Sequence, residues 1–307
     1  MTRCAPRSDR GGKVAKLRLT LLRCALGAGL MAAAHPALSQ EQYPVSGVGF
    51  PRGDVFDPLV ANPREPRLLG AVAHVRLSNE RMTMAAASVG DNVGIFRWLG
   101  NGPRDGVQLG LLGGIFAQFD LSSPSNDLVN ADYVIGIPIT WRHRRLSARA
   151  SIYHQSSHLG DEYLLTHPVE RINLSFEAVT LLLSGEAGAW RLYGGGEYLV
   201  HHDPSDLGNG IAQGGAEYRG RTTWLNLGGM GRGRPVIAVD LRSWQQHHWM
   251  PGLSVNAGLR FLSNRSLSQW SGRSWSVLGV LYYGPSPYGQ FYSETVRYLG
   301  MALQLGF

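Results

Sequence analysis

The first indication of the fold is the C-terminal stretch Leu299-Gly300-Met301-Ala302-Leu303-Gln304-Leu305-Gly306-Phe307. Successive side chains of a β-strand point to opposite faces, so this stretch places its large apolar residues on one face only. Small or polar residues occupy the other face, and the final residue is aromatic. The pattern predicts a strand over residues 296–307 with one apolar face.

Residues 1–39 are predicted to form a cleaved secretory signal peptide. Basic residues come first, an apolar stretch runs from Cys24 to Ala34, and Ala37-Leu38-Ser39 supplies small residues where a signal peptidase cleaves. We expect cleavage after Ser39. The apolar stretch is too short for a membrane-spanning helix, which needs about 20 residues.

Removal of this segment changes the charge and the chemistry of the chain. Seven of the 29 Lys and Arg residues and one of the 22 Asp and Glu residues precede residue 40, which leaves 22 against 21 and a net charge of +1. This balance gives a nucleic-acid partner no electrostatic support. Cys4 and Cys24 also leave, so the mature chain can form no disulfide and no thiolate metal site. Adjacent histidines, as in His201-His202, point to opposite faces of an extended chain, and we expect no metal and no cofactor.

The mature chain consists of short segments that alternate between apolar and polar residues. The mean hydropathy of the full 307-residue sequence is −0.11. After the signal peptide, no apolar run approaches the length of a spanning helix. A transmembrane barrel has this character, because its lumen-facing polar residues balance its lipid-facing apolar ones. A secreted soluble β-sandwich would share the alternation.

We expect an all-β fold: a single transmembrane antiparallel β-barrel of about twelve strands over residues 67–307, with ten or fourteen strands as alternatives. Residues 40–66 contain five prolines and are expected to form an irregular periplasmic lead-in. Residues 219–233 break the pattern and can hide a further strand. The predicted strands are 68–77, 82–98, 106–121, 131–143, 146–157, 171–184, 189–201, 210–218, 234–245, 252–262, 272–284 and 296–307.

The alternating final strand resembles the assembly signal of bacterial outer-membrane β-barrels. The resemblance implies an integral outer-membrane protein whose neighbours are outer-membrane lipids and lipopolysaccharide. It also implies recognition by the barrel-assembly machinery through Leu299, Met301, Leu303, Leu305 and Phe307.

Several stretches resemble an outer-membrane β-barrel family that is catalogued only as a domain of unknown function, number 1207. This resemblance runs along nearly the whole mature chain and implies a barrel in the outer membrane, but it supplies no activity. The stretches are Phe56-Asp57-Pro58-Leu59-Val60-Ala61-Asn62-Pro63-Arg64-Glu65-Pro66-Arg67, Ser157-His158-Leu159-Gly160-Asp161-Glu162-Tyr163, Arg171-Ile172-Asn173, Ala238-Val239-Asp240-Leu241 and Ser286-Pro287-Tyr288-Gly289-Gln290-Phe291-Tyr292.

One predicted strand carries a candidate for nucleophilic chemistry. His154 and Ser156 are two residues apart, so their side chains emerge on one face, and shared alternation with Ile152 turns that face towards lipid. A serine hydroxyl needs an adjacent base, and the base needs an orienting group, for which Asn173 and Asp161 are candidates. A polar strand end that enters a loop is the alternative explanation.

The His-x-Ser pattern resembles the active-site motif of outer-membrane phospholipase A and of lipid A deacylases. That resemblance implies a lipid-acyl hydrolase whose dyad faces the lipid. The chain departs from the phospholipase pattern after the serine, where Ser157-His158 replaces Asn-Gly.

Charged and amide side chains on predicted inward faces form a second candidate site. Unpaired charge is costly in a dry core, so these residues suit a wet lumen. They can line a pore or fill a narrow barrel as a salt-bridged plug. The expected lumen-lining residues are Arg142, Arg149, Arg171, Asn173, Glu177, Glu197, Asp240 and Arg260.

The leading hypothesis for function is a non-enzymatic outer-membrane barrel that is structural, pore-like in the manner of a porin, or envelope-interacting, with a polar lumen. The alternative is an outer-membrane lipid-acyl hydrolase. The direction in which His154 and Ser156 point separates the two.

Overall fold

A computed structural model describes residues 46–306 except 78–79, 103, 168–170 and 263–273. The predicted signal peptide, the first residues of the lead-in and the terminal Phe307 therefore lie outside the described residues.

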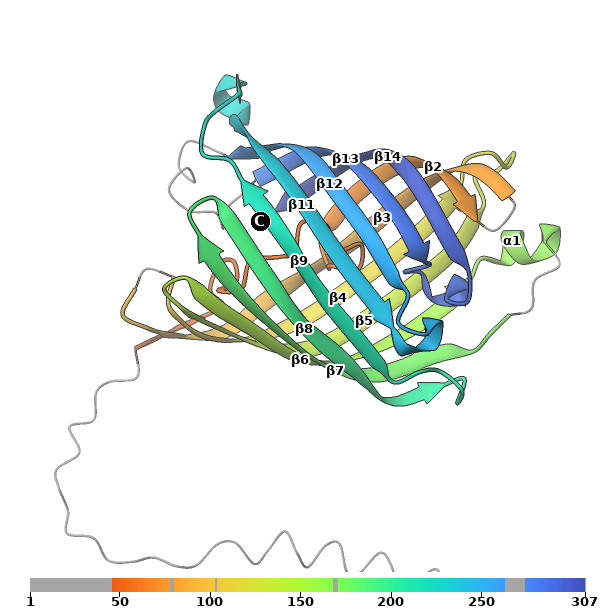
Figure 1. Cartoon of the computed structure of the whole chain (residues 1–307), viewed down its shortest axis with the longest axis horizontal. Coiled ribbons are helices and arrows are strands. Elements are labelled where there is room, and N and C mark those ends of the chain that lie inside the picture. The colour runs from red at the N-terminus through yellow and green to blue at the C-terminus, as the bar shows by residue number, and fades with distance from the viewer. Residues whose placement is uncertain (1–45, 78–79, 103, 168–170, 263–273, 307) are drawn as a thin grey trace, which may run out of the picture. The chain divides into compact units, whose positions relative to one another are not determined.

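Within the described residues, twelve antiparallel strands close into a barrel (Figure 1). Each strand pairs with its neighbour along the chain, and β14 pairs with β2 to complete the ring. The wall strands are β2 (Leu68–Leu77), β3 (Glu80–Leu99), β4 (Gly106–Asp120), β5 (Leu128–His143), β6 (Leu146–Leu159), β7 (Leu174–Ala187), β8 (Trp190–Asp203), β9 (Gly210–Arg219), β11 (Arg232–Trp244), β12 (Pro251–Leu262), β13 (Ser274–Pro285) and β14 (Thr295–Gly306).

Six short elements accompany the wall. Strand β1 (Gly47–Gly49) pairs with β3, and β10 (Leu225–Asn226) pairs with β11 inside the segment where a further strand was expected. Helix α1 (Asp161–Thr166) and the 3-10 turns η1 (Gly228–Met230), η2 (Gln245–His247) and η3 (Gly289–Phe291) lie between wall strands. Among the described residues, no helix is long and apolar enough to cross a membrane.

The wall has an apolar outside and a polar inside, the reverse of a soluble protein. Large apolar side chains such as Ile135, Ile137 and Ile139 are about half exposed on the outer surface. The intervening positions point inwards, and Thr140 and Arg142 on the same strand are almost fully buried. Water-facing surfaces rarely carry such a continuous apolar band, whereas a barrel that faces lipid requires one.

The two ends of the barrel differ in their connections. Two-residue turns join β5 to β6 and β7 to β8 at the end where β2 begins and β14 stops. Helix α1 and the turn η3 lie at the opposite end (Figure 1). The exposed Trp141 and Trp190 both lie near the end with the short turns, as expected for an interfacial aromatic belt.

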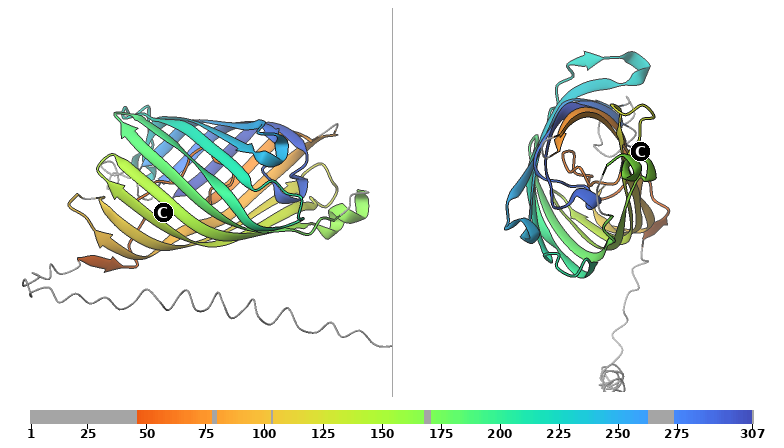
Figure 2. Two further views of the ribbon diagram at one scale, coloured as in Figure 1. Left: turned by 60° about the horizontal axis from the view of Figure 1, so that its bottom comes forward. Right: turned by 90° about the vertical axis from the view of Figure 1, so that its right-hand side faces the viewer.

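The segment from Pro51 to Arg67, which we call the plug, lies inside the ring of strands. The end-on view in Figure 2 shows this orange segment within the barrel. Phe56, Asp57 and Glu65 are at most 2% exposed. The prediction from the sequence is different: it puts residues 40–66 in an irregular lead-in that precedes the barrel. The difference has a physical cause: the plug carries charges that match opposite charges on the inner wall.

Candidate functional site

Asp57 is the centre of the ion network that joins the plug to the wall. Its carboxylate pairs with Arg104, with Arg142 at 3.5 Å and with Arg219 at 2.9 Å. Burial opposes ionisation of this carboxyl, but the guanidinium groups of Arg219 and Arg104 outweigh it and hold its pKa well below the ordinary value. Asp57 is therefore a buried anion that needs its arginine partners.

A second set of contacts fixes the other end of the plug. Glu65 accepts two hydrogen bonds from Arg149, at 2.6 and 2.9 Å, in the bidentate geometry that suits a guanidinium and a carboxylate. Burial raises the pKa of the Glu65 carboxyl, but Arg149 outweighs this effect, and the net pKa is lowered. The Phe56 ring packs between Arg149 and Arg191, at 4.8 and 4.7 Å from its centroid. Charge and cation–π contacts together make the plug part of the barrel interior.

The plug also reaches the loop that follows β13. Arg64 pairs with Asp132 at 2.7 Å, and the same carboxylate accepts a 3.1 Å hydrogen bond from the backbone N–H of Gly289 in η3. Gln290 donates a 2.8 Å hydrogen bond to the backbone oxygen of Ser157. Three of the stretches that carry the family resemblance thus meet around one buried carboxylate.

Five of the eight predicted lumen residues do point inwards. Arg142 and Arg149 contact the plug as described. Glu197 pairs with Arg242 at 2.8 Å, and Asp240 accepts a 2.7 Å hydrogen bond from the Tyr193 hydroxyl. Arg260 is the fifth, and it donates to Ser274 at 3.0 Å. These contacts show a polar, hydrogen-bonded interior in the described part of the barrel.

The other three predicted lumen residues, Arg171, Asn173 and Glu177, lie elsewhere. Arg171 and Asn173 are exposed in the segment before β7, and Glu177 is on the outer surface of that strand. The inward positions of β7 belong to Leu174, Phe176 and Ala178, all of which are buried. The outward set is polar only near one end of the strand, beyond the apolar residues that face lipid. Prediction from polarity therefore places Glu177 on the wrong face of β7, and it extends the strand over Arg171 and Asn173, which precede it.

Glu177 belongs to a polar row on the outer wall, formed with His154 and His201, which we call the outer-wall row. His154 on β6, Glu177 on β7 and His201 on β8 are neighbours across the three strands. Nδ1 of His154 lies 2.7 Å from one oxygen of Glu177, and Nδ1 of His201 lies 2.8 Å from the other. A β-bulge at Val200 turns both Val200 and His201 outwards, which completes the row.

Ser156 lies two residues beyond His154 on the same outer face, opposite Ser175 of β7. Among the described residues, its hydroxyl makes no hydrogen bond to His154. Asn173 donates instead to Asp203 at 2.6 Å, and Asp161 begins helix α1, so neither predicted orienting residue contacts His154 in this part of the chain. The carboxylate that contacts His154 is Glu177, which was predicted to line the lumen.

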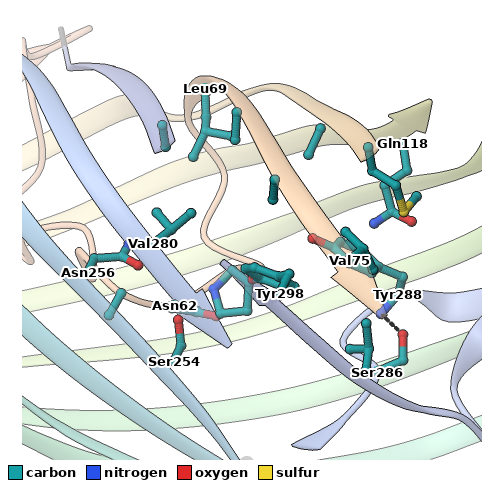
Figure 3. Close-up of a pocket in the computed structure, with 18 of the residues that line it drawn as sticks. Asn62, Leu69, Val75, Gln118, Ser254, Asn256, Val280, Ser286, Tyr288 and Tyr298 are labelled. Carbon is teal, nitrogen blue, oxygen red and sulfur yellow. Dashed lines mark hydrogen bonds between the residues drawn. The ribbon is translucent and has the colours of Figure 1, made fainter. Parts of the chain in front are cut away.

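A small apolar cavity of about 90 Å³ remains between the plug and the inner faces of β2 and β14 (Figure 3). The cavity exists because several side chains on these strands are alanines. It is lined by Val75, Val280 and Tyr298, together with Asn62 of the plug. The described residues contain no group of three or more His, Cys, Asp or Glu side chains arranged to hold a metal.

The closed ring, the polar interior and the apolar exterior define a barrel of the kind found in bacterial outer-membrane proteins. Residues 33–307 match the family described as protein of unknown function (DUF1207), and the chain belongs to that family. No curated protein matches the sequence.

Solved structures with a similar fold include outer-membrane phospholipases. Outer membrane phospholipase A from Escherichia coli is 14% identical with a TM-score of 0.51, and the match covers 81% of this chain and 93% of that one. An active-site mutant of the same protein, also 14% identical, gives a TM-score of 0.53 over 81% and 93% of the two chains. The phospholipase dimer with bound calcium from Salmonella typhi is 13% identical, with a TM-score of 0.51 over 82% and 95%. At these identities the likeness establishes the fold alone.

Proposed function

We propose that this protein is an integral outer-membrane barrel whose lumen is sealed by its own plug and whose outer wall interacts with the envelope. The apolar band around the wall supports a membrane location, since such a surface is stable against lipid and not against water. The buried charged side chains on the inner wall support a polar lumen, and the plug supports a closed form of it.

The single observation that carries this proposal is the ion network of Asp57. An open pore needs a continuous water path, and its lining charges face water. Here Arg142 of the wall and Asp57 of the plug are at most 2% exposed and pair with each other inside the lumen. A plug held in this way fills the barrel and favours a structural or envelope-interacting role over conduction.

Two measurements test the proposal. In cell fractionation, we expect the protein to appear in the outer-membrane fraction. We also expect it to resist extraction by alkaline carbonate in the absence of detergent. In planar bilayers, the refolded protein is expected to give no steady open-channel conductance. Release without detergent would refute the membrane location, and a large stable conductance in the intact protein would refute the seal.

The outer-wall row favours a second candidate, a lipid-acyl hydrolase. The hydrogen bond from His154 Nδ1 to Glu177 leaves Nε2 as the proton acceptor, and Ser156 is the neighbouring hydroxyl on the same outer surface, next to the apolar band. Glu177 thus supplies the orienting group that a serine–histidine pair requires. All three side chains are accessible from outside the wall, where an acyl ester in the membrane can approach.

The proposed reaction has two stages. His154 takes the proton of Ser156 while Oγ attacks the ester carbonyl, and the protonated histidine then gives that proton to the departing alcohol. Water, activated by His154, cleaves the acyl-serine and releases the fatty acid. The reaction requires side-chain rotation that brings the Ser156 hydroxyl to His154, a contact that the described structure does not contain.

Release of fatty acid from phospholipid and from lipid A, measured on the refolded full chain, tests this candidate. Ser156→Ala is expected to abolish release, and Glu177→Gln to lower it by roughly 100-fold or more, as loss of an orienting carboxylate does in a serine triad. Ser175→Ala is the matched control, because Ser175 lies directly opposite Ser156 on the same face. Activity that survives in Ser156→Ala, or is absent from the intact protein, would exclude the hydrolase.

A further inference from the structure

Three arginines stand side by side on the outer wall at the seam of the barrel. Arg81 on β3 lies opposite Arg76 on β2, and Arg76 lies opposite Arg297 on β14. Directly opposed residues of antiparallel strands share a face, and the alternation of these strands turns that face outwards. Neighbouring strands are about 4.8 Å apart, so the three Cα positions span roughly 10 Å. We call these residues the arginine row.

The arginine row lies directly above the apolar band. Leu299 is two residues from Arg297 on the same face of β14, and Met301 follows two residues further on; both are more than 60% exposed. At about 3.4 Å per residue, the row is roughly 7 Å from the nearest leucine. In a membrane barrel, the edge of the apolar band lies where the headgroups of a lipid leaflet meet its acyl chains. The row is at the α1 and η3 end of the barrel, the predicted outer side.

The wall is hollowed around the arginine row. An open depression of about 640 Å³ is lined by the three arginines together with His74, Tyr283 and Leu299. No acidic side chain is among the described residues that line it. The depression thus joins a cationic upper part to an apolar lower part, which is the profile of a lipid with an anionic headgroup.

We propose that the arginine row binds the phosphate of a lipid A-type glycolipid in the outer leaflet. Guanidinium groups bind phosphate oxygens in bidentate pairs, and three positive charges suit a phosphomonoester, which carries up to two negative charges, better than a phosphodiester with one. The acyl chains of the lipid lie against Leu299 and Met301. The site deepens the proposed envelope interaction and rests on it, because it requires that this end of the barrel face the outer leaflet.

The test uses the full chain refolded in zwitterionic detergent micelles and titrated with three lipids: lipid A, lipid A stripped of its phosphates, and phosphatidylglycerol. Bound lipid is counted by native mass spectrometry. Arg76→Gln with Arg297→Gln is compared with Arg144→Gln with Arg145→Gln, which removes the same charge from the exposed turn at the other end of the barrel. Heat-modified gel migration checks that each variant is folded.

We expect lipid A to bind the intact protein most tightly, and the first variant to lose about ten-fold or more in affinity while the control stays within about two-fold. Affinity is also expected to fall with added salt. Equal binding of phosphatidylglycerol, unchanged binding in the first variant, or equal loss in the control would each overturn the site. Fractionation separates the failures: an outer-membrane protein without this selectivity refutes only the arginine row, whereas release without detergent refutes the proposed function as well.

Discussion

Replacement of Asp57 by Asn is the most informative perturbation of the plug. The carboxylate pairs with three arginines, of which Arg142 and Arg219 have side chains only 2% and 9% exposed. Asparagine keeps the shape but removes the negative charge, so the arginines remain buried beside a neutral amide. Removal of one partner from a buried ion pair costs about 3–5 kcal/mol.

That cost acts on the equilibrium between docked and undocked plug. Arginines freed from a departed plug regain water, so the undocked state loses much less than the docked one. At about 1.4 kcal/mol per factor of ten, the ratio of undocked to docked plug rises roughly 100- to several-thousand-fold. We expect bursts of conductance from Asp57→Asn in planar bilayers and none from the intact protein.

The matched control is Asp161→Asn, the same chemical change at an exposed position in α1. Heat-modified migration reports on the wall itself and is expected to stay close to that of the intact protein, since the strand ladder is unaltered. If Asp57→Asn shows no more conductance in planar bilayers than Asp161→Asn, the ion network does not hold the plug in place, and the proposed seal by Asp57 is refuted.

Two other predictions concern the same interior. The pKa values of Asp57 and Glu65 are held below their ordinary values of 3.8 and 4.5, so their contribution to docking is fully present above those ordinary values and is lost as the pH falls through the lowered ones. Conductance should therefore appear only on acidification well below about pH 4 and should disappear again on neutralisation; conductance that appears at alkaline pH instead would contradict this sign. In η3, a Cβ added to Gly289 would lie 2.4 Å from the Ser157 hydroxyl oxygen, whereas one added to Gly113 meets nothing within 4 Å. Gly289→Ala should cost about 1–3 kcal/mol and lower the temperature of heat-modified migration, and a matching loss in Gly113→Ala would show that the clash is not the cause.

The strands of the wall could be predicted from the sequence because lipid enforces period-two alternation. The expected strand at 68–77 coincides with β2, and all twelve predicted strands are present with ends shifted by up to about three residues. The expected count of about twelve is confirmed within the described residues.

The plug could not be predicted, because it has no period and its partners are distant in the sequence. Glu65 pairs with Arg149, which is 84 residues further along the chain, and Asp57 pairs with Arg219, which is 162 residues further along. Proline and charge in residues 51–67 are equally typical of a surface segment, and only the tertiary fold brings each charge to its partner.

The outer-wall row could be predicted only in part from the sequence. Val179, Leu181 and Leu183 share the parity of Glu177, and their size indicates the lipid-facing side, so a rule that weighs the whole strand would have placed Glu177 correctly. His201 could not be found in the same way. It faces outwards because of the bulge at Val200, and strict alternation places it on the inner face.

The plug ends at Arg67, and β2, one of the two strands that close the ring, begins at the next residue. Arg67 donates a 3.0 Å hydrogen bond to Gln304 on β14, the other closing strand. Two events of folding, the filling of the barrel and the joining of its first and last strands, are therefore coupled in one place. A chain that fails to seat its plug also loses a contact across the seam, so docking of the plug and closure of the ring support each other during assembly.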